Sequence, residues 1–450
     1  MRILHYTLGV PPYRSGGLTK YATDLMSAQS ACGDMVSLLY PGDYTFWRVP
    51  KIKIIRNEKY NGVSVYEIKN PSLVPLLYGV RNPSDVLEHS KKLSEQILEQ
   101  FYTEVKPDVM HIHTLMGLPL ELVVYLKEKG VKIVFTSHDY YGLCPKVNFI
   151  NQNGVFCNSP GGKQCALCNK NAPGSLFLRL RNSKYLLKYK SKLSSRTTKA
   201  EVGKNKLSKE VYITQEKSDE YTALLDYYKK LFELIDCFHF NSTVSQKVYN
   251  QYLVPKQSFV LPITHAEIKD DRKLKKIDPK HIRLAFIGGL TIYKGFPILK
   301  DVLCELYSKG IRNWSLQVWG GNIGVDSECE RIIYKGKYTS DNLVHVFDEI
   351  DLLIVPSVWK ETFSLITLEA LSNGVPVLVS YNVGAKDIIN GYNSNFVFHP
   401  SKKALDIKLQ DILNNPSLLS CYNEKIWLNK FKYLLDDHIQ KVKQLYNKSL

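Results

Sequence analysis

The sequence contains no run of apolar residues long enough to cross a membrane. A spanning helix needs about 20 consecutive apolar residues, and no apolar run in the 450 residues approaches that length. The first residues do not resemble a secretory signal peptide, because their apolar run is short and Pro11 and Pro12 interrupt it. Low-complexity tracts are also absent. These absences favour a folded cytoplasmic protein.

Acidic residues are scarce relative to basic ones. The chain has 60 Lys and Arg against 43 Asp and Glu, a net charge of +17, and residues 176–210 alone carry a net +9. The first part of this stretch mixes apolar and basic residues, as an interfacial helix does. It predicts contact with an anionic membrane surface at the inner face of the plasma membrane, and a solvated basic insertion is the alternative. No nucleic-acid-binding motif accompanies the charge, so we expect no nucleic-acid partner.

Disulfides are not expected either, because the predicted compartment keeps thiols reduced. Four of the nine cysteines nevertheless cluster, and the last two form a Cys-x2-Cys knuckle. This spacing indicates a candidate structural zinc site, with an unmetallated loop or redox chemistry as alternatives. The four predicted ligands are Cys144, Cys157, Cys165 and Cys168.

Strand-like and helical segments alternate along most of the chain. Strand, glycine loop and helix follow one another from Arg2 to Ala31, and the same unit recurs from residue 282 onward. The alternation predicts an α/β protein with two facing, doubly wound Rossmann-like domains and a cleft at the strand ends. The predicted segments are an N-terminal domain at 1–265 with an insertion at about 142–215, a C-terminal domain at 280–430, and a helix at 431–450 packing back toward the N-terminal domain.

Two carboxylates, Glu361 and Glu369, bracket the start of a predicted helix that follows a buried strand. A carboxylate two turns into a helix can accept both hydroxyls of a ribose, while backbone N–H groups at a helix start can bind phosphate or sugar oxygens. The segment therefore suggests a nucleotide-sugar site. The alternative is that both glutamates are surface charges of the helix.

The surrounding motifs strengthen the site interpretation. Gly288-Gly289 follows a predicted strand, Lys294-Gly295 follows shortly after, and Pro356-Ser, Glu361, Glu369 and Gly374-x-Pro376 come in that order. Earlier in the chain lie Gly16-Gly17, Asp108-x2-His111-x-His113 and His138-Asp139. Together these motifs resemble the retaining glycosyltransferases of family 4, the group 1 glycosyltransferases, and the resemblance implies the GT-B fold.

The resemblance also implies roles for individual residues. Glu369 would bind the ribose, Lys294 the diphosphate, and Glu361 and His138 the donor sugar. For His111 and His113, their place in a strand favours support of the strand end over a direct role. The implied catalytic residues are His138, Glu361 and Lys294. The implied substrate-binding residues are Gly16, Gly17, Thr362, Phe363, Ser364, Leu365 and Glu369.

One position departs from the family pattern. Gly289 stands where many members have an arginine that helps neutralise the diphosphate. Arg14, Lys20 and Arg283 are candidates to replace that charge, and weaker donor binding is the alternative. The sequence has no Asp-x-Asp motif, so we expect no cofactor in catalysis.

The function implied by the resemblance is retaining transfer of a hexose-type sugar from a nucleotide-diphosphate sugar to an acceptor hydroxyl. The expected acceptor is a saccharide or lipid-linked saccharide, in bacterial capsule, O-antigen, lipopolysaccharide or exopolysaccharide synthesis. Two alternatives remain: a GT-B-type epimerase or phosphorylase, and a non-catalytic nucleotide-sugar-binding protein.

Overall fold

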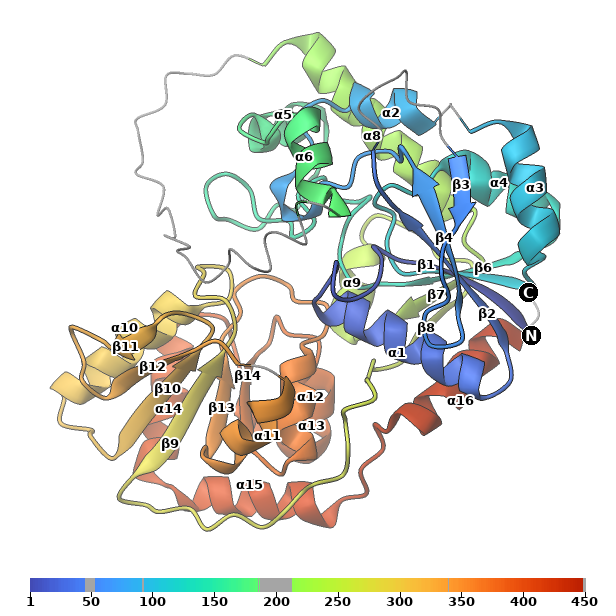
Figure 1. Ribbon diagram of the computed structural model, residues 1–450. Coiled ribbons are helices and arrows are strands. Elements are labelled where there is room, and N and C mark those ends of the chain that lie inside the picture. Colours follow the sequence, from blue (N-terminus) through green and yellow to red (C-terminus); the bar gives the residue numbers. More distant parts are fainter. Residues whose placement is uncertain (45–52, 91–92, 185, 187–212, 339, 448–450) are drawn as a thin grey trace. The chain divides into compact units, whose positions relative to one another are not determined.

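The computed structural model describes the chain except residues 45–52, 91–92, 185, 187–212, 339 and 448–450 (Figure 1). It divides into two compact units. The N-terminal unit comprises 1–239, 249–259 and 439–450, and the C-terminal unit comprises 240–248 and 260–438. Among the described residues, no helix is both long and apolar enough to span a bilayer.

The N-terminal unit is built on an eight-stranded sheet with the order β3-β4-β2-β1-β5-β6-β7-β8. The pairs from β4 to β7 are parallel, and β3 runs antiparallel at the edge. The strands are β1 (Arg2–Tyr6), β2 (Met35–Pro41), β3 (Lys53–Arg56), β4 (Ser64–Lys69), β5 (Val109–Ile112), β6 (Lys132–Thr136), β7 (Cys237–Phe240) and β8 (Ser258–Val260).

Helices cover both faces of this sheet. The chain steps from β1 through α1 to β2 in one direction and from β5 through α4 to β6 in the other. Since such crossovers are right-handed, α1 and α4 lie on opposite faces. The helices are α1 (Gly17–Ala31), α2 (Ser84–Ser90), α3 (Glu95–Val105), α4 (Leu120–Glu128), α5 (Gly162–Asn169), α6 (Ser175–Asn182), α8 (Gln215–Glu233) and α16 (Leu435–Asn447), with a 3-10 turn, η1, at Leu76–Tyr78. Helix α9 (Thr243–Tyr249) follows β7 and, except for its last residue, belongs to the C-terminal unit.

The C-terminal unit has a seven-stranded sheet with the order β11-β12-β10-β9-β13-β14-β15. Its strands are parallel except β11, which pairs antiparallel with β12. The strands are β9 (Ile282–Ile287), β10 (Trp314–Trp319), β11 (Ile323–Val325), β12 (Ile332–Gly336), β13 (Leu352–Val355), β14 (Val377–Ser380) and β15 (Val397–Phe398). The helices are α10 (Phe296–Ser308), α11 (Ser340–Asp348), α12 (Leu365–Ser372), α13 (Lys386–Asn393), α14 (Lys402–Asn414) and α15 (Ser417–Leu428), with a 3-10 turn, η2, at Ser394–Phe396.

Most residues of the central strands of both sheets are buried, because helices cover both faces of each sheet. All four residues of β13 and of β14 are buried, for example. The predicted α/β class with two doubly wound sheets is therefore confirmed. In such sheets ligands bind beyond the carboxyl ends of the strands, which is where the candidate residues lie.

Candidate active site

The two loops that carry Lys294 and Glu361 touch each other at the carboxyl edge of the C-terminal sheet. Lys294 lies between β9 and α10, and Glu361 lies between β13 and α12. Gly295 makes the contact possible, because its φ is +77° and a Cβ there would lie 2.0 Å from the Pro356 carbonyl oxygen. Only glycine fits this close approach.

Lys294 and Glu361 form an ion pair. The lysine Nζ donates to Glu361 Oε1 at 2.6 Å, and the Ser357 hydroxyl donates to Glu361 Oε2 at 2.7 Å. The Lys294 ammonium also lies 5.7 Å from the centre of the Trp359 ring. The Glu361 carboxylate is largely buried and both of its oxygens accept a hydrogen bond. The structure thus brings together two of the three predicted catalytic residues.

The backbone from Glu361 to Phe363 is held on two sides. The Gly384 N–H donates to the Glu361 carbonyl and the Ala385 N–H to the Phe363 carbonyl, both at 2.9 Å. The Ser242 hydroxyl donates to the Thr362 carbonyl at 2.5 Å. These bonds hold the segment rigidly at the start of α12. The Phe363 side chain is buried in the core, so only its backbone is available to a ligand.

Ser364 precedes α12 in a strained conformation. Its φ is +99°, which is uncommon for a residue with a Cβ. Such strain is found most often at functional sites. α12 begins at Leu365, and the N–H groups of the first turn have no acceptor within the helix. N–H groups of this kind can bind an anion, and Lys294 contacts Glu361, which lies three residues before Ser364.

Glu369 belongs to α12 and lines a pocket of about 430 Å³. Its Oε1 hydrogen-bonds to Nε2 of the buried His265 at 2.8 Å. Burial and the negative charge of Glu369 raise the pKa of Tyr338, so these two side chains are neighbours. The sequence does not single out His265 or Tyr338, because no motif or spacing links either residue to Glu369. His265, for example, precedes Glu369 by 104 residues.

In the N-terminal unit, Gly16 precedes α1 with a φ of +109°. A Cβ built there would meet no atom within 4 Å, so the helix start is open to a ligand. Gly17 is the first residue of α1. The two predicted glycines therefore present backbone, without a capping side chain, at the N-terminus of a helix of 15 residues.

His138 follows β6 and is half-buried. Burial, helped by the nearby His239, lowers its pKa to about 3. Its Nε2 lies 3.2 Å from Nδ1 of the buried His113, and its ring contacts Tyr21. A histidine in this environment is neutral near pH 7, so it can exchange hydrogen bonds with a ligand but carries no charge.

The four clustered cysteines are electrostatic neighbours in the insertion. Burial, together with the other three thiols, raises the pKa of Cys165 to about 12, and the Gly161 N–H donates to its sulfur at 3.3 Å. Among described residues, the only three potential metal ligands whose donor atoms lie within 4.8 Å of one another are His5, His111 and His113. No three of the four cysteine sulfurs therefore lie that close to one another, and the zinc site stays a prediction.

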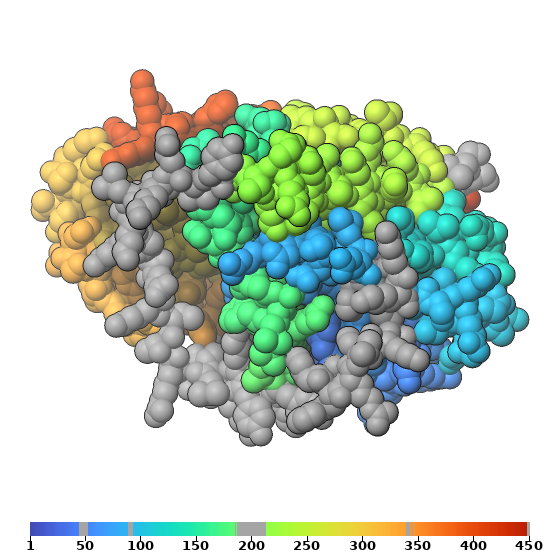
Figure 2. Space-filling model, turned by 90° about the horizontal axis from the view of Figure 1, so that it is seen from above, coloured from blue at the N-terminus to red at the C-terminus, as the bar shows by residue number. Residues whose placement is uncertain are grey.

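Much of the predicted basic stretch lies outside the described residues. Its described residues are 176–184 and 186, and within them α6 exposes Leu176, Phe177 and Leu180 to solvent. Figure 2 shows this green segment on the surface beside the blue segment that includes α2. The Phe177 ring contacts Tyr78.

The candidates for the missing arginine differ in position. Arg283 pairs with the buried Asp351 at 2.6 Å, at the amino end of β9 and therefore at the edge opposite Lys294. Arg14 donates to Asn182 in the N-terminal unit. At Gly289 a Cβ would meet only a Thr291 methyl at 3.8 Å, so a side chain fits there.

Comparisons with known proteins agree with the sequence resemblance. Residues 267–426 match the family described as glycosyl transferases group 1. An uncharacterized 42.6 kDa protein in the cps region of Klebsiella pneumoniae is 24% identical over 340 residues, which is 72% of each chain.

Solved structures resemble nearly the whole chain. The α,α-trehalose 6-phosphate synthase of Burkholderia multivorans matches with a TM-score of 0.58 and 12% identity, over 98% of this chain and 95% of that one. An Anabaena protein solved with UDP and glucose matches with a TM-score of 0.54 and 11% identity, over 99% and 98%. The chain therefore has the GT-B fold, and its residues 267–426 match the group 1 glycosyltransferases.

Proposed function

We propose that the protein transfers a sugar from a nucleotide-diphosphate sugar to an acceptor hydroxyl with retention of anomeric configuration, in bacterial surface polysaccharide synthesis. One observation carries the proposal. The Lys294–Glu361 pair lies just before α12 and Glu369 lies about one turn into this helix beside a pocket, all in one unit. This spacing suits a ligand with a sugar at one end, a diphosphate in the middle and a nucleoside at the other.

Each part of such a donor has a matching group. The Glu369 carboxylate accepts both ribose hydroxyls, with His265 holding it in place. The diphosphate lies against the first-turn N–H groups of α12 and the Lys294 ammonium. Glu361 accepts a hydroxyl of the donor sugar with a remaining lone pair.

The chemical step is limited by charge separation. The bond from the anomeric carbon to the diphosphate oxygen breaks, and a bond to the acceptor oxygen forms on the same face. The acceptor proton passes to an oxygen of the leaving diphosphate. Lys294 and the helix N–H groups stabilise the negative charge that develops, because they are already oriented before the reaction. Both oxygens of Glu361 are already engaged, which favours a positioning role for Glu361 over a nucleophilic one.

His138 receives the role that the resemblance implies, contact with the donor sugar. Its neutral state suits a hydrogen bond to a sugar hydroxyl, and it cannot serve as a charged general acid near pH 7. The hexose-type donor and the retained configuration are also taken from the resemblance.

The setting in polysaccharide synthesis is supported by relatives. Two of them are described as uncharacterized proteins in the cps region of Klebsiella pneumoniae, each 24% identical to this chain. We therefore propose a cytoplasmic enzyme whose acceptor is a saccharide or a lipid-linked saccharide.

A lipid-linked acceptor requires access to a membrane surface, and α6 supplies apolar side chains for it. Leu176 and Phe177 are 63% and 50% exposed, and Arg179 and Arg181 lie on the same helix. Apolar side chains that insert among headgroups, next to cations, bind anionic bilayers. We expect Phe177→Ser to weaken co-sedimentation with phosphatidylglycerol vesicles severalfold. Ile407→Ser, at an exposed apolar position of the C-terminal unit, is the control, and equal binding of both variants would remove α6 from the proposal.

The function is tested by incubating the protein with UDP- and GDP-sugars and a panel of alcohols and oligosaccharides, with products followed by mass spectrometry. A glycoside whose anomeric proton shows the donor's configuration by NMR supports the proposal. A changed sugar epimer, a free sugar phosphate, or binding without turnover would instead indicate the epimerase, phosphorylase or binding-protein alternatives.

Donor recognition is tested by Glu369→Gln. Since hydrogen bonds to a charged group contribute about 1.5–3 kcal/mol, the variant should bind the nucleoside diphosphate at least about tenfold more weakly in calorimetry. Glu424→Gln, on the exposed face of α15, should bind like wild type.

A further inference from the structure

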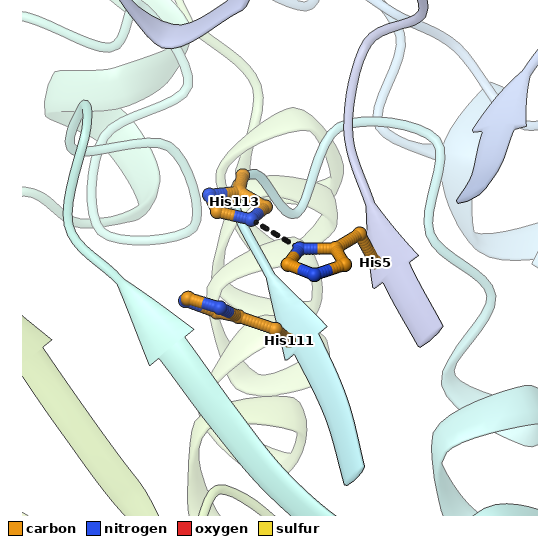
Figure 3. A group of neighbouring side chains, drawn as sticks. All are labelled: His5, His111 and His113. Carbon is orange, nitrogen blue, oxygen red and sulfur yellow. Dashed lines mark hydrogen bonds between the residues drawn. The ribbon is translucent and has the colours of Figure 1, made fainter. Parts of the chain in front are cut away.

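A stripe of polar side chains crosses the otherwise apolar N-terminal sheet. His5 of β1 is paired in register with His111 of β5, and Thr136 of β6 is paired with His239 of β7. His113 follows His111 by two residues and so lies on the same face. Figure 3 shows His5, His111 and His113 gathered there. Gln29 of α1 and Tyr446 of α16 complete the stripe from the helices that cover this face.

Hydrogen bonds join these side chains into one chain, the histidine chain, with Gln29 near its middle. On one arm, Gln29 Oε1 is 2.8 Å from His5 Nε2, His5 Nδ1 is 3.0 Å from His113 Nε2, and His113 Nδ1 is 3.2 Å from His138 Nε2. The rings of His5 and His113 are stacked.

The other arm starts from the amide nitrogen of Gln29. It lies 3.1 Å from the Tyr446 hydroxyl, which is 2.7 Å from His111 Nδ1. His111 Nε2 is 2.6 Å from the Thr136 hydroxyl, which is 2.9 Å from His239 Nδ1. Of the eight members, only His138 is more than 9% exposed, and it lies at the end of the first arm.

The proton positions along the histidine chain follow from the acidity of the Tyr446 hydroxyl. A phenol is a stronger hydrogen-bond donor than a neutral imidazole, so the Tyr446 hydroxyl donates to His111 Nδ1. That hydroxyl has no second proton and must accept from the Gln29 amide nitrogen. The Gln29 oxygen then accepts from His5 Nε2–H, and the alternation continues. His113 Nε2–H donates to His5, and His138 Nε2–H donates to His113.

The same atoms are poorly suited to a metal ion. His5, His111 and His113 place ligand atoms within 4.8 Å of one another. However, these nitrogens already have hydrogen-bond partners, which include each other, Gln29, Tyr446 and Thr136. No carboxylate accompanies them in that group, so a divalent cation would break these bonds in a dry site without charge compensation. The hydrogen-bonded chain is therefore the favoured state.

We infer that Tyr446 and Gln29 are positioning residues that hold His138 in the Nε2–H tautomer, through His5 and His113, so that His138 accepts a hydrogen bond at Nδ1 from a hydroxyl of the sugar substrate. This inference depends on the proposed function for the identity of the substrate. The histidine chain explains why a glutamine on α1 and a tyrosine on the last helix are buried beside histidines. They act on His138 through the intervening side chains of His5 and His113.

The direct test reads the tautomers in the substrate-free protein. Protein labelled with ¹⁵N at histidine distinguishes a protonated ring nitrogen from a bare one by NMR, and a His138→Gln variant assigns the signal. We expect Nε2–H for His138 in the wild type. A His138 that is Nδ1–H, or charged at pH 7.5, overturns the inference even if sugar transfer is observed.

Tyr446→Phe provides the second test. Without the hydroxyl, neither orientation of the Gln29 amide is preferred, so both tautomers of His138 should appear in comparable amounts. With the best substrate, kcat/KM should fall about twofold, in proportion to the loss of the Nε2–H form. Tyr6→Phe is the matched control, because it removes a buried hydroxyl of the same unit that donates to the Met116 carbonyl, outside the chain. If the ratio of the two His138 tautomers is the same in Tyr446→Phe as in the wild type, the inference is contradicted.

Gln29→Lys should reverse the direction of the hydrogen bonds between His5 and His138, since the lysine amine places a donor opposite His5 Nε2. We expect Nδ1–H at His138 and a loss of at least about tenfold in kcat/KM, the effect of one hydrogen bond. Because a buried lysine lowers stability, Tyr446→Phe decides the matter if this variant does not fold. Stoichiometric zinc that survives Cys165→Ser and disappears in His111→Gln would overturn the inference in favour of a metal site. Failure of sugar transfer with the expected tautomers would instead overturn the proposed function.

Discussion

Mild acid should destabilise the N-terminal sheet selectively, because its histidines are buried in the neutral form. Burial lowers the pKa of His5 to about 4 and that of His138 to about 3, and it lowers the pKa of His113 well below the ordinary value. In the unfolded chain each takes a proton near pH 6.5. The unfolded state therefore binds more protons below pH 6.5, and the stability present above that pH is lost as the pH falls toward 4.

The magnitude follows from proton linkage. Between pH 7.5 and 5.5 each of the three histidines stays neutral in the folded sheet and becomes protonated when unfolded, which costs roughly 1.4 kcal/mol apiece. Asp139 acts in the opposite direction, because burial raises its pKa to about 6. Because the folded state takes up a proton at Asp139 over this pH range, the free energy of unfolding increases by roughly 0.8 kcal/mol. The net loss is about 3 kcal/mol, a large part of the stability of a typical domain.

Hydrogen exchange with mass spectrometry can measure this loss for the N-terminal sheet alone. Peptides covering β1 and β5 report the opening free energy of that sheet. After correction for the intrinsic pH dependence of exchange, protection should fall about a hundredfold between pH 7.5 and 5.5. Peptides covering β13 and β14 of the C-terminal unit serve as an internal reference and should change much less.

A matched pair of variants separates the histidines from general acid effects. His5→Asn should reduce the pH-dependent loss by about 1.4 kcal/mol, whatever its effect on stability at pH 7.5. His281→Asn removes an exposed histidine and should leave the loss unchanged. Protection of β1 that is equal at both pH values in the wild type would refute the neutral, buried histidine chain.

Four other changes test the candidate site and the insertion. Lys294→Met should lower kcat about a hundredfold in a transfer assay, because it removes a charge aimed at the leaving diphosphate, and an unchanged kcat would contradict that role. Gly289→Arg adds a cation where a side chain fits, so calorimetry should show a nucleoside diphosphate binding about tenfold more tightly; weaker binding would show that the space serves another purpose. Ser364→Gly should be more stable than Ser364→Ala by about 1 kcal/mol in urea unfolding, since both lose the hydroxyl and only glycine relieves the positive φ. Elemental analysis should find one zinc per chain that Cys165→Ser removes, and metal-free wild-type protein would exclude the zinc site.

The fold was predictable because its signals are local. Strands such as Leu352–Val355 are short, continuous apolar runs that end at Pro, Gly or Ser, and the alternation of such runs with helical spacing identifies a doubly wound sheet. The pairing of Lys294 with Glu361 was not stated from the sequence. Each was placed after a strand, and parallel strands bring their carboxyl ends to one edge.

Other features were hidden because they depend on contacts between distant segments. His265 and Tyr338 have no motif, and only the packing around α12 brings them to Glu369. Gln29 and Tyr446 are separated by 417 residues. In the sequence, Tyr446 is one of the 29 tyrosines of the chain.

The sequence by itself determined the α/β class, the family resemblance and the identity of the glutamates, lysine and glycines of the candidate site, because short-range patterning and motif order encode them. The tertiary structure alone decided how these residues are connected. Strand register placed His5 beside His111, and the return of α16 to the N-terminal unit placed a phenol beside them. Hydrogen bonding is directional and acts over about 3 Å, so it is decided only when the chain has folded.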